Sequence, residues 1–111
     1  MWVRSAFWVG RIRPAFEHQF LAAIDDELVP ALRQLPGVRG ARSLWPRRIE
    51  DAPPGIACQI LVEFGSRADV DRMLSSTERQ ALRLRVREVA AMFEGTISHI
   101  DFEVGGGCGA S

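Results

Sequence analysis

The stretch from Glu27 to Val38 constrains the fold more than any other part of the sequence. Apolar residues recur every four positions from Phe16 into this stretch, which is the period of a helix with one buried face. Pro36-Gly37 then ends the helix, and a strand is predicted to follow at once. Pro30 lies inside the helix and is expected to kink or break it, because proline lacks an N–H and clashes with the preceding turn.

Strand patterns account for most of the remaining chain. The alternation is clearest in residues 56–64, where every second side chain is apolar. The four predicted strands are residues 3–12, 38–45, 56–64 and 96–104. A second helix, in two pieces capped by Ser66 and Ser75, is predicted between the last two strands. This βαββαβ order is the ferredoxin-like topology of the α+β class, a four-stranded antiparallel sheet with two helices on one face.

Composition indicates one globular domain without a charged partner. The 111 residues fit a single domain, residues 1–104, followed by a glycine-rich tail, residues 105–111, that is expected to be disordered. Fourteen basic residues balance 14 acidic ones, so no global field favours nucleic acid or a membrane surface. No apolar run reaches the length of a signal peptide or a membrane span. Two distant cysteines fit a reducing compartment, and a cytoplasmic location is expected.

Helices on one side of the sheet leave its other face open. Alternation predicts that Ile100 and Phe102 face the helices, together with the apolar positions of residues 56–64. The residues then predicted to face away, and to form a dimer interface, are Gln59, Leu61, Glu63, His99 and Asp101. The first strand adds either Ala6 and Trp8 or Phe7 and Val9, and the second adds Trp45 or Leu44. At least one tryptophan is therefore expected on the open face, which predicts a homodimer with the two sheets packed face to face.

The segment from Leu28 to Val38 (LVPALRQLPGV) resembles the helix end of EthD-like proteins. These belong to the dimeric α+β barrel superfamily, with the stress-responsive and antibiotic-biosynthesis monooxygenase groups. Residues 60–64, 68–70 and 74–78 resemble the second half of the family, and residues 99–104 resemble the last strand of the stress-responsive group. The resemblance spans most of residues 3–104. It implies a homodimer with a pocket between sheet and helices.

The resemblance also bears on chemistry. Relatives include isomerases, polyketide cyclases, cofactor-free monooxygenases, haem-using enzymes and members without known activity. EthD-like proteins often carry a histidine two residues before the helical proline, where this chain has Leu28. The resemblance therefore implies the fold of the family, with Leu28 in the wall of the pocket. The acid/base histidine that the family often has at this position is missing.

His99 and Asp101 are the first catalytic candidates. Alternation places them on one strand face, where a carboxylate can orient and charge an imidazole for acid/base work. The alternative is a hydrogen-bond network at a dimer interface, which buried polar groups also require. His18, beside the apolar stripe in the first turn of the first helix, is the other candidate base, and solvent exposure is its alternative.

Ligand contacts are predicted for Trp8, Trp45 and Arg42 as well as for Leu28. The indoles can stack on a flat aromatic compound, or pack within the core or an interface. Arg42 can bind a carboxylate bidentately, or form a salt bridge at a rim. The stripe Arg79, Arg83 and Arg87 is interpreted as a solvated helix face.

Other motifs are missing or inert. Cys58 is expected to be a core thiol and Cys108 an exposed one. The sequence contains no HExxH, paired CxxC, P-loop or GxGxxG, so neither a metal nor a cofactor is expected. RNA binding through a βαββαβ sheet needs exposed aromatic residues, but the predicted open face of residues 56–64 has none.

Two hypotheses remain. The first is a dimeric protein that binds a small apolar or aromatic compound, without chemistry of its own. The second is a cofactor-free isomerase, cyclase or monooxygenase that acts on an aromatic or polyketide-like metabolite.

Overall fold

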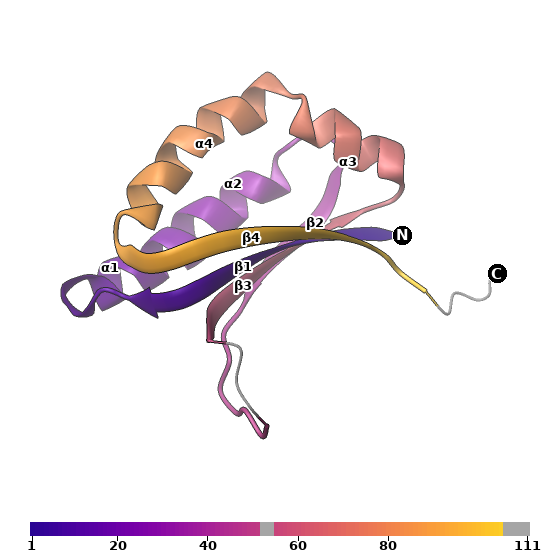
Figure 1. Cartoon of the computed structure of the whole chain (residues 1–111). Helices are drawn as coiled ribbons and strands as arrows, with labels where there is room; N and C mark the ends of the chain where they lie inside the picture. The colour runs from indigo at the N-terminus through magenta and orange to yellow at the C-terminus, as the bar shows by residue number, and fades with distance from the viewer. Residues whose placement is uncertain (52–54, 106–111) are drawn as a thin grey trace.

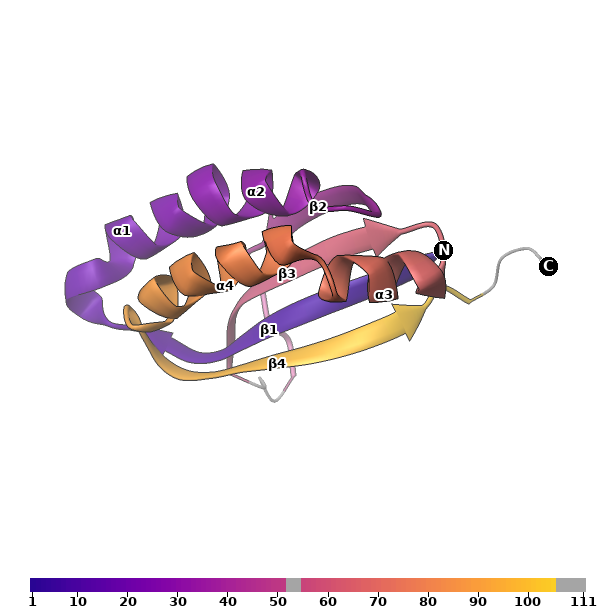
Figure 2. The same cartoon turned by 90° about the horizontal axis from the view of Figure 1, so that it is seen from above.

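The computed structural model describes residues 1–51 and 55–105. One antiparallel sheet contains four strands in the order β2-β3-β1-β4. The strands are β1 (Trp2–Ile12), β2 (Val38–Leu44), β3 (Ile56–Phe64) and β4 (Phe93–Glu103). The helices are α1 (Glu17–Ala22), α2 (Val29–Arg33), α3 (Arg67–Leu74) and α4 (Thr77–Ala90). All of them lie on one face of the sheet (Figure 1 and Figure 2). The predicted ferredoxin-like fold is confirmed, and the predicted tail lies outside the described residues except for Gly105.

The helical segments between β1 and β2 continue through Pro30. A 3-10 turn (Pro14–Phe16) precedes α1, and a π-helical segment (Ala23–Leu28) joins α1 to α2. Within this segment the N–H of Val29 bonds to the carbonyl of Ile24, five residues earlier. This wider turn lies immediately before Pro30. Because proline has no N–H, an α-helix would lose one backbone hydrogen bond here, and the π-helical turn changes the hydrogen-bond register at that point. Of the predicted kink or break at Pro30, the break is not found, because the helix widens before the proline and continues past it.

The second predicted helix consists of the two predicted pieces, α3 and α4. Ser66 caps α3 by accepting a hydrogen bond from the N–H of Asp69. The cap of α4 is Ser76, which accepts from the N–H of Arg79 at 3.1 Å. The prediction of Ser75 is wrong by one residue, since Ser75 ends α3. No helix in the described part of the chain is long and apolar enough to cross a membrane.

The sheet register decides which side chains face the helices. Cross-strand partners share a face, and Trp8 is paired with Cys58 on one side and Ile97 on the other. Because Trp8 and Cys58 are buried, this face is the one under the helices. Ile60, Val62 and Phe64 lie on it, as predicted from alternation.

The two faces of β4 are exchanged relative to the prediction. His99 is paired with Ala6 and Asp101 with Arg4, so both lie on the helix side of the sheet. Ile100 and Phe102 lie on the open face and are 46% and 41% exposed. The alternation was correctly identified, but alternation alone does not say which set faces the core.

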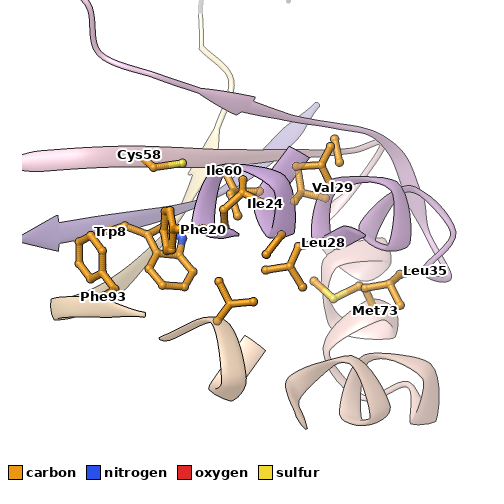
Figure 3. Close-up of a cluster of buried hydrophobic side chains, with 14 of the residues drawn as sticks. Trp8, Phe20, Ile24, Leu28, Val29, Leu35, Cys58, Ile60, Met73 and Phe93 are labelled. Carbon is orange, nitrogen blue, oxygen red and sulfur yellow. The ribbon is translucent and has the colours of Figure 1, made fainter. Parts of the chain in front are cut away.

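Aromatic packing closes one end of the core. Trp8 meets Phe20 and Phe93 edge-on, with ring centroids 5.2 and 5.4 Å apart, and these two phenylalanines stack on each other. Figure 3 shows this group together, with Leu28 and Met73 further along the core. Trp8 thus helps to join β1, α1 and β4. The expected tryptophan on the open face is absent because Trp8 packs here instead.

Candidate functional site: a cavity between the sheet and the helices

A cavity of about 400 Å³ lies between the sheet and the helices. Its walls come from β1, β3 and β4 on one side and from the helices on the other. The residues that line it are Arg4, Ala6, Trp8, Leu28, Leu32, Ile60, Val62, Met73, Arg79, Leu82, Arg83, Val86, Arg87, Ala90, Ile97 and His99. Its volume falls within the range of small-molecule sites.

The sheet wall of the cavity is mainly apolar. Ala6, Trp8, Ile60 and Ile97 lie on the helix face of three neighbouring strands. Ala6 leaves space because its side chain is a single methyl group. Trp8 Nε1 is buried and, within the described part of the chain, is the one such side-chain atom without a hydrogen-bond partner. A buried donor left unpaired costs about 1–3 kcal/mol.

The helical wall alternates apolar and basic side chains. Along α4, Leu82 and Val86 face the cavity together with Arg79, Arg83 and Arg87. These positions recur at spacings of three and four, so they form one stripe along the helix. Arg83 and Arg87 are exposed, in agreement with the interpretation as a solvated face, and Arg79 is half-buried. The sequence did not predict that this face also lines the cavity.

The polar groups lie at the rim, where exposure increases. Arg4 donates to Asp101, with Nη1 2.8 Å from Oδ1. Arg83 and His99 are exposed, whereas Leu28 and Val62 in the interior are buried. The cavity therefore has an apolar interior and a cationic rim.

His99 is held toward its neutral form. His99 is exposed at one side and partly desolvated at the other. This partial burial lowers the pKa of His99 below its usual value of 6.5, and the charges of Arg4 and Arg79 lower it further. Asp101 acts in the opposite direction but contributes least. The expectation that Asp101 charges the imidazole is wrong, because Asp101 bonds to Arg4 instead. A neutral imidazole can accept a proton or a hydrogen bond.

Two predicted ligand contacts are in the cavity wall and two are not. Trp8 and Leu28 line the cavity. Trp45 forms a T-shaped pair with Phe20 and donates to Asp25 at 3.2 Å, so it anchors the helical segments between β1 and β2 to the end of β2. These contacts match the packing alternative that the sequence left open.

Arg42 and His18 lie away from the cavity. Arg42 is paired with Leu61 on the open face, and its Nη2 lies 3.7 Å from Glu63 Oε1. The salt-bridge alternative for Arg42 is the observed one. His18 is exposed on α1 and does not line the cavity.

The open face of the sheet carries apolar side chains among polar ones. Besides Ile100 and Phe102, strand register places Phe7, Leu44 and Leu61 there. Gln59 and Glu63 are on this face as predicted, and Gln59 donates to the buried Ser5 at 3.0 Å. The register excludes His99 and Asp101 from this face, which corrects the predicted composition of the interface.

Cys58 is the one cysteine among the residues that the structure describes, and Cys108 lies outside them. Cys58 is fully buried, and burial raises its thiol pKa to about 12, with a smaller contribution from the charge of Asp25. Residues 1–51 and 55–105 contain no group of three or more His, Cys, Asp or Glu side chains that would hold a metal ion.

Sequence reasoning missed Arg4 and Arg79 as site residues. Arg4 interrupts an apolar strand on the same alternation as Trp8, which is the signal that would have placed it in the core layer. Arg79 lies three residues before Leu82 in the apolar stripe, which indicates the same helix face.

Comparison with known proteins bears on the fold. No protein-family model matches the chain, and no curated protein matches it significantly. An EthD family protein from Bacillus halodurans C-125 superposes with a TM-score of 0.74 at 12% identity, over 94% of this chain and 98% of that one. A dimeric ferredoxin-like protein of unknown function from Jannaschia sp. CCS1 gives 0.64 at 19% identity, over 94% and 100%. SnoaB, a cofactor-independent oxygenase from Streptomyces nogalater, gives 0.62 at 12% identity, over 94% and 91%.

These superpositions each extend over 94% of this chain, so they cover the sheet together with its helices. At such identities they report the fold and not the ligand. The chain therefore has the ferredoxin-like α+β fold that these proteins share.

Proposed function

We propose that this protein binds a small apolar or aromatic compound in the cavity between the sheet and the helices. The observation that carries the proposal is the cavity itself, about 400 Å³ lined mainly by aliphatic side chains and the indole of Trp8. The cavity opens to solvent at its rim, so apolar side chains of its walls are left in contact with water. A compound that covers them would stabilise the folded chain.

Trp8 supports the apolar character of the site at its buried end. Its indole ring lines the cavity, where it can pack against an aromatic compound. Its Nε1–H has no protein acceptor but is shielded from solvent, so Trp8 contributes ring surface to the site and not a hydrogen bond.

The proposal includes a homodimer formed through the open face. That face exposes Ile100, Phe102 and Leu44, and apolar side chains gathered on one face are typical of a protein–protein contact. The similar protein from Jannaschia is described as dimeric. A two-fold contact through this face leaves the cavity on the opposite side of the sheet accessible.

Filling the cavity tests the function. Ala6→Ile adds methyl groups to the sheet wall, where a β-branched residue suits a strand. We expect this variant to lose binding of 2-naphthamide, a neutral aromatic probe, while its thermal midpoint stays the same or rises. Ala81→Ile, on the exposed side of α4, is the matched control and keeps binding. The proposal is contradicted if 2-naphthamide does not bind the natural chain, or binds Ala6→Ile equally well.

The second candidate function is proton transfer by His99. The observation that favours it is the position of this imidazole in the cavity wall, with a lowered pKa that keeps it able to accept a proton. The likeness to a cofactor-independent oxygenase is consistent with chemistry that needs no metal.

A carbon acid separates binding from this chemistry. The protein is expected to exchange the acidic protons of 2-naphthylacetone for deuterium faster than buffer does, and His99→Gln is expected to abolish the acceleration without abolishing binding. Equal exchange rates with and without the natural protein would remove the catalytic candidate and leave the binding function.

A further inference from the structure

We propose that the compound bound in the cavity carries a carboxylate, which Arg79 and Arg83 bind at the rim while the apolar body fills the interior. The inference rests on the proposed function, because it names the class of compound that the same cavity takes. Its basis is the contrast between the arginines on the two sides of α4.

The one arginine of α4 that lies outside the cavity is neutralised, whereas the three that face it are not. Arg85 binds Glu27 at 2.9 Å and Glu88 at 3.3 Å. Arg79, Arg83 and Arg87 have no carboxylate within 4 Å among the residues that the structure describes. One helix thus presents one paired cation to its outer side and a row of unpaired cations to a cavity.

The carboxylate at the rim of the cavity is already engaged. Asp101 lies 2.8 Å from Arg4, so each neutralises the other. Arg79 and Arg83 therefore face the cavity with excess positive charge. His99 adds no compensating negative charge, since its imidazole is either neutral or cationic.

This arrangement destabilises the charged form of Arg79. Burial lowers the pKa of its guanidinium, and the neighbouring charges of Arg83 and Arg4 lower it further. Its charged form is therefore less favourable in the folded protein than in water. An anion placed between Arg79 and Arg83 would reverse the repulsion, and its attraction would be strengthened by the partly desolvated site.

Geometry favours a carboxylate on an apolar body. Arg79 and Arg83 are one helical turn apart, so their guanidinium groups can approach the same group, and the planar fork of arginine suits bidentate binding of a carboxylate. Deeper in the cavity the walls are Leu28, Ile60 and Val62, which offer no second site for charge. The arrangement fits a compound with its anionic group at one end.

Two probes that share a ring system test the inference. Intrinsic tryptophan fluorescence can follow the binding of 2-naphthoate and of neutral 2-naphthamide. We expect 2-naphthoate to bind more tightly, and the double variant Arg79→Gln/Arg83→Gln to weaken it by about tenfold or more while changing 2-naphthamide little. Arg79→Lys/Arg83→Lys, which keeps both charges, should retain most of the preference for the anion.

Arg85→Gln is the matched control, because it removes the same charge from the same helix outside the cavity. It should leave the binding of both probes unchanged. A purely structural role for Arg79 and Arg83 predicts instead that the glutamine variant loses both probes together and melts at a lower temperature, which would overturn the inference.

Failure of the inference differs from failure of the proposed function. If both probes bind equally well, and the arginine variants affect neither, the carboxylate inference is wrong and the apolar cavity remains a binding site. If neither probe binds the natural chain, the proposed function is wrong, and the inference fails with it.

Discussion

His99 is the direct partner of Ala6 across the β1–β4 ladder, so its imidazole lies against the helices and not on the open face of the sheet. Ala6 contributes only a methyl group, which leaves space in front of the imidazole. Arg4 and Arg79 are the cations whose charges act on His99, and Asp101 is the carboxylate that acts on it. This pairing brings the one histidine of the cavity wall beside its arginines.

Stability should fall in mild acid because of His99. Its pKa in the folded protein lies below the usual value of 6.5, chiefly through burial. As the pH drops below about 6.5, the unfolded chain therefore binds protons that the folded chain does not, and folding free energy is lost until the lowered pKa is passed. Above that window the full stability is present.

His99→Gln should flatten the pH dependence of unfolding in that window, measured by urea denaturation at a series of pH values. His18→Gln, which removes an exposed imidazole on α1, is the control. A natural chain and a His99→Gln variant with parallel pH profiles would show that His99 does not titrate as described.

Cys58 should resist thiol reagents in the folded state. Its side chain is fully buried, and its pKa is raised to about 12, so almost no thiolate is present at neutral pH. In a Cys108→Ser variant, which leaves Cys58 as the only cysteine, Ellman's reagent should react slowly until guanidinium chloride unfolds the chain. Rapid reaction in buffer would contradict the burial of this strand.

Gly95 should not tolerate a side chain. It faces Gly10 across β1 and β4, and the two residues have φ values of 151° and 138°. A Cβ at Gly95 would collide with the carbonyl of Val9 and lie 2.9 Å from the Cα of Gly10. We expect Gly95→Ala to lose about 2 kcal/mol or more of unfolding free energy in urea.

Gly105→Ala is the control for that substitution. Its added Cβ would meet nothing within 4 Å, so the unfolding free energy should change little. Equal stability of the Gly95 and Gly105 variants would show that β1 and β4 do not approach as closely as described.

The open face should carry the dimer contact. Phe102→Asp places a charge there and is expected to convert a dimer, twice the 12.3 kDa chain mass, into a monomer in light-scattering chromatography. Leu84→Asp alters a side chain that is 64% exposed on α4 and should leave the dimer intact. A natural chain that elutes as a monomer would remove the homodimer from the proposed function.

Much of the fold could be predicted because local patterns determine it. The alternation from Ile56 to Phe64 gave the bounds of β3 and its buried face, since a strand has period two. The serine caps predicted that the helical region between β3 and β4 has two pieces. Pro30 was misjudged because the register shift that accommodates it depends on six preceding residues and not on proline alone.

The site was harder to predict because it depends on register. Alternation placed His99 and Asp101 together, but only pairing with β1 shows that they face the helices. Shifting a strand by one residue exchanges its two faces. The sequence of β4 alone does not show which face is buried, because the more apolar set, Ile100 and Phe102, is the one that the structure exposes. Arg79 was assigned to solvent because charge is usually exposed, whereas here the apolar stripe of α4 borders a cavity.

Isoleucine methyl groups provide the most direct test of the cavity as the binding site. Ile60 and Ile97 line the cavity, whereas Ile100 lies on the open face and Ile49 is exposed in the β2–β3 connection. With δ1-methyl labelling, a titration with 2-naphthoate should shift the resonances of Ile60 and Ile97 and leave those of Ile100 and Ile49 in place. Shifts confined to Ile100, or no shift at any isoleucine, would contradict the account.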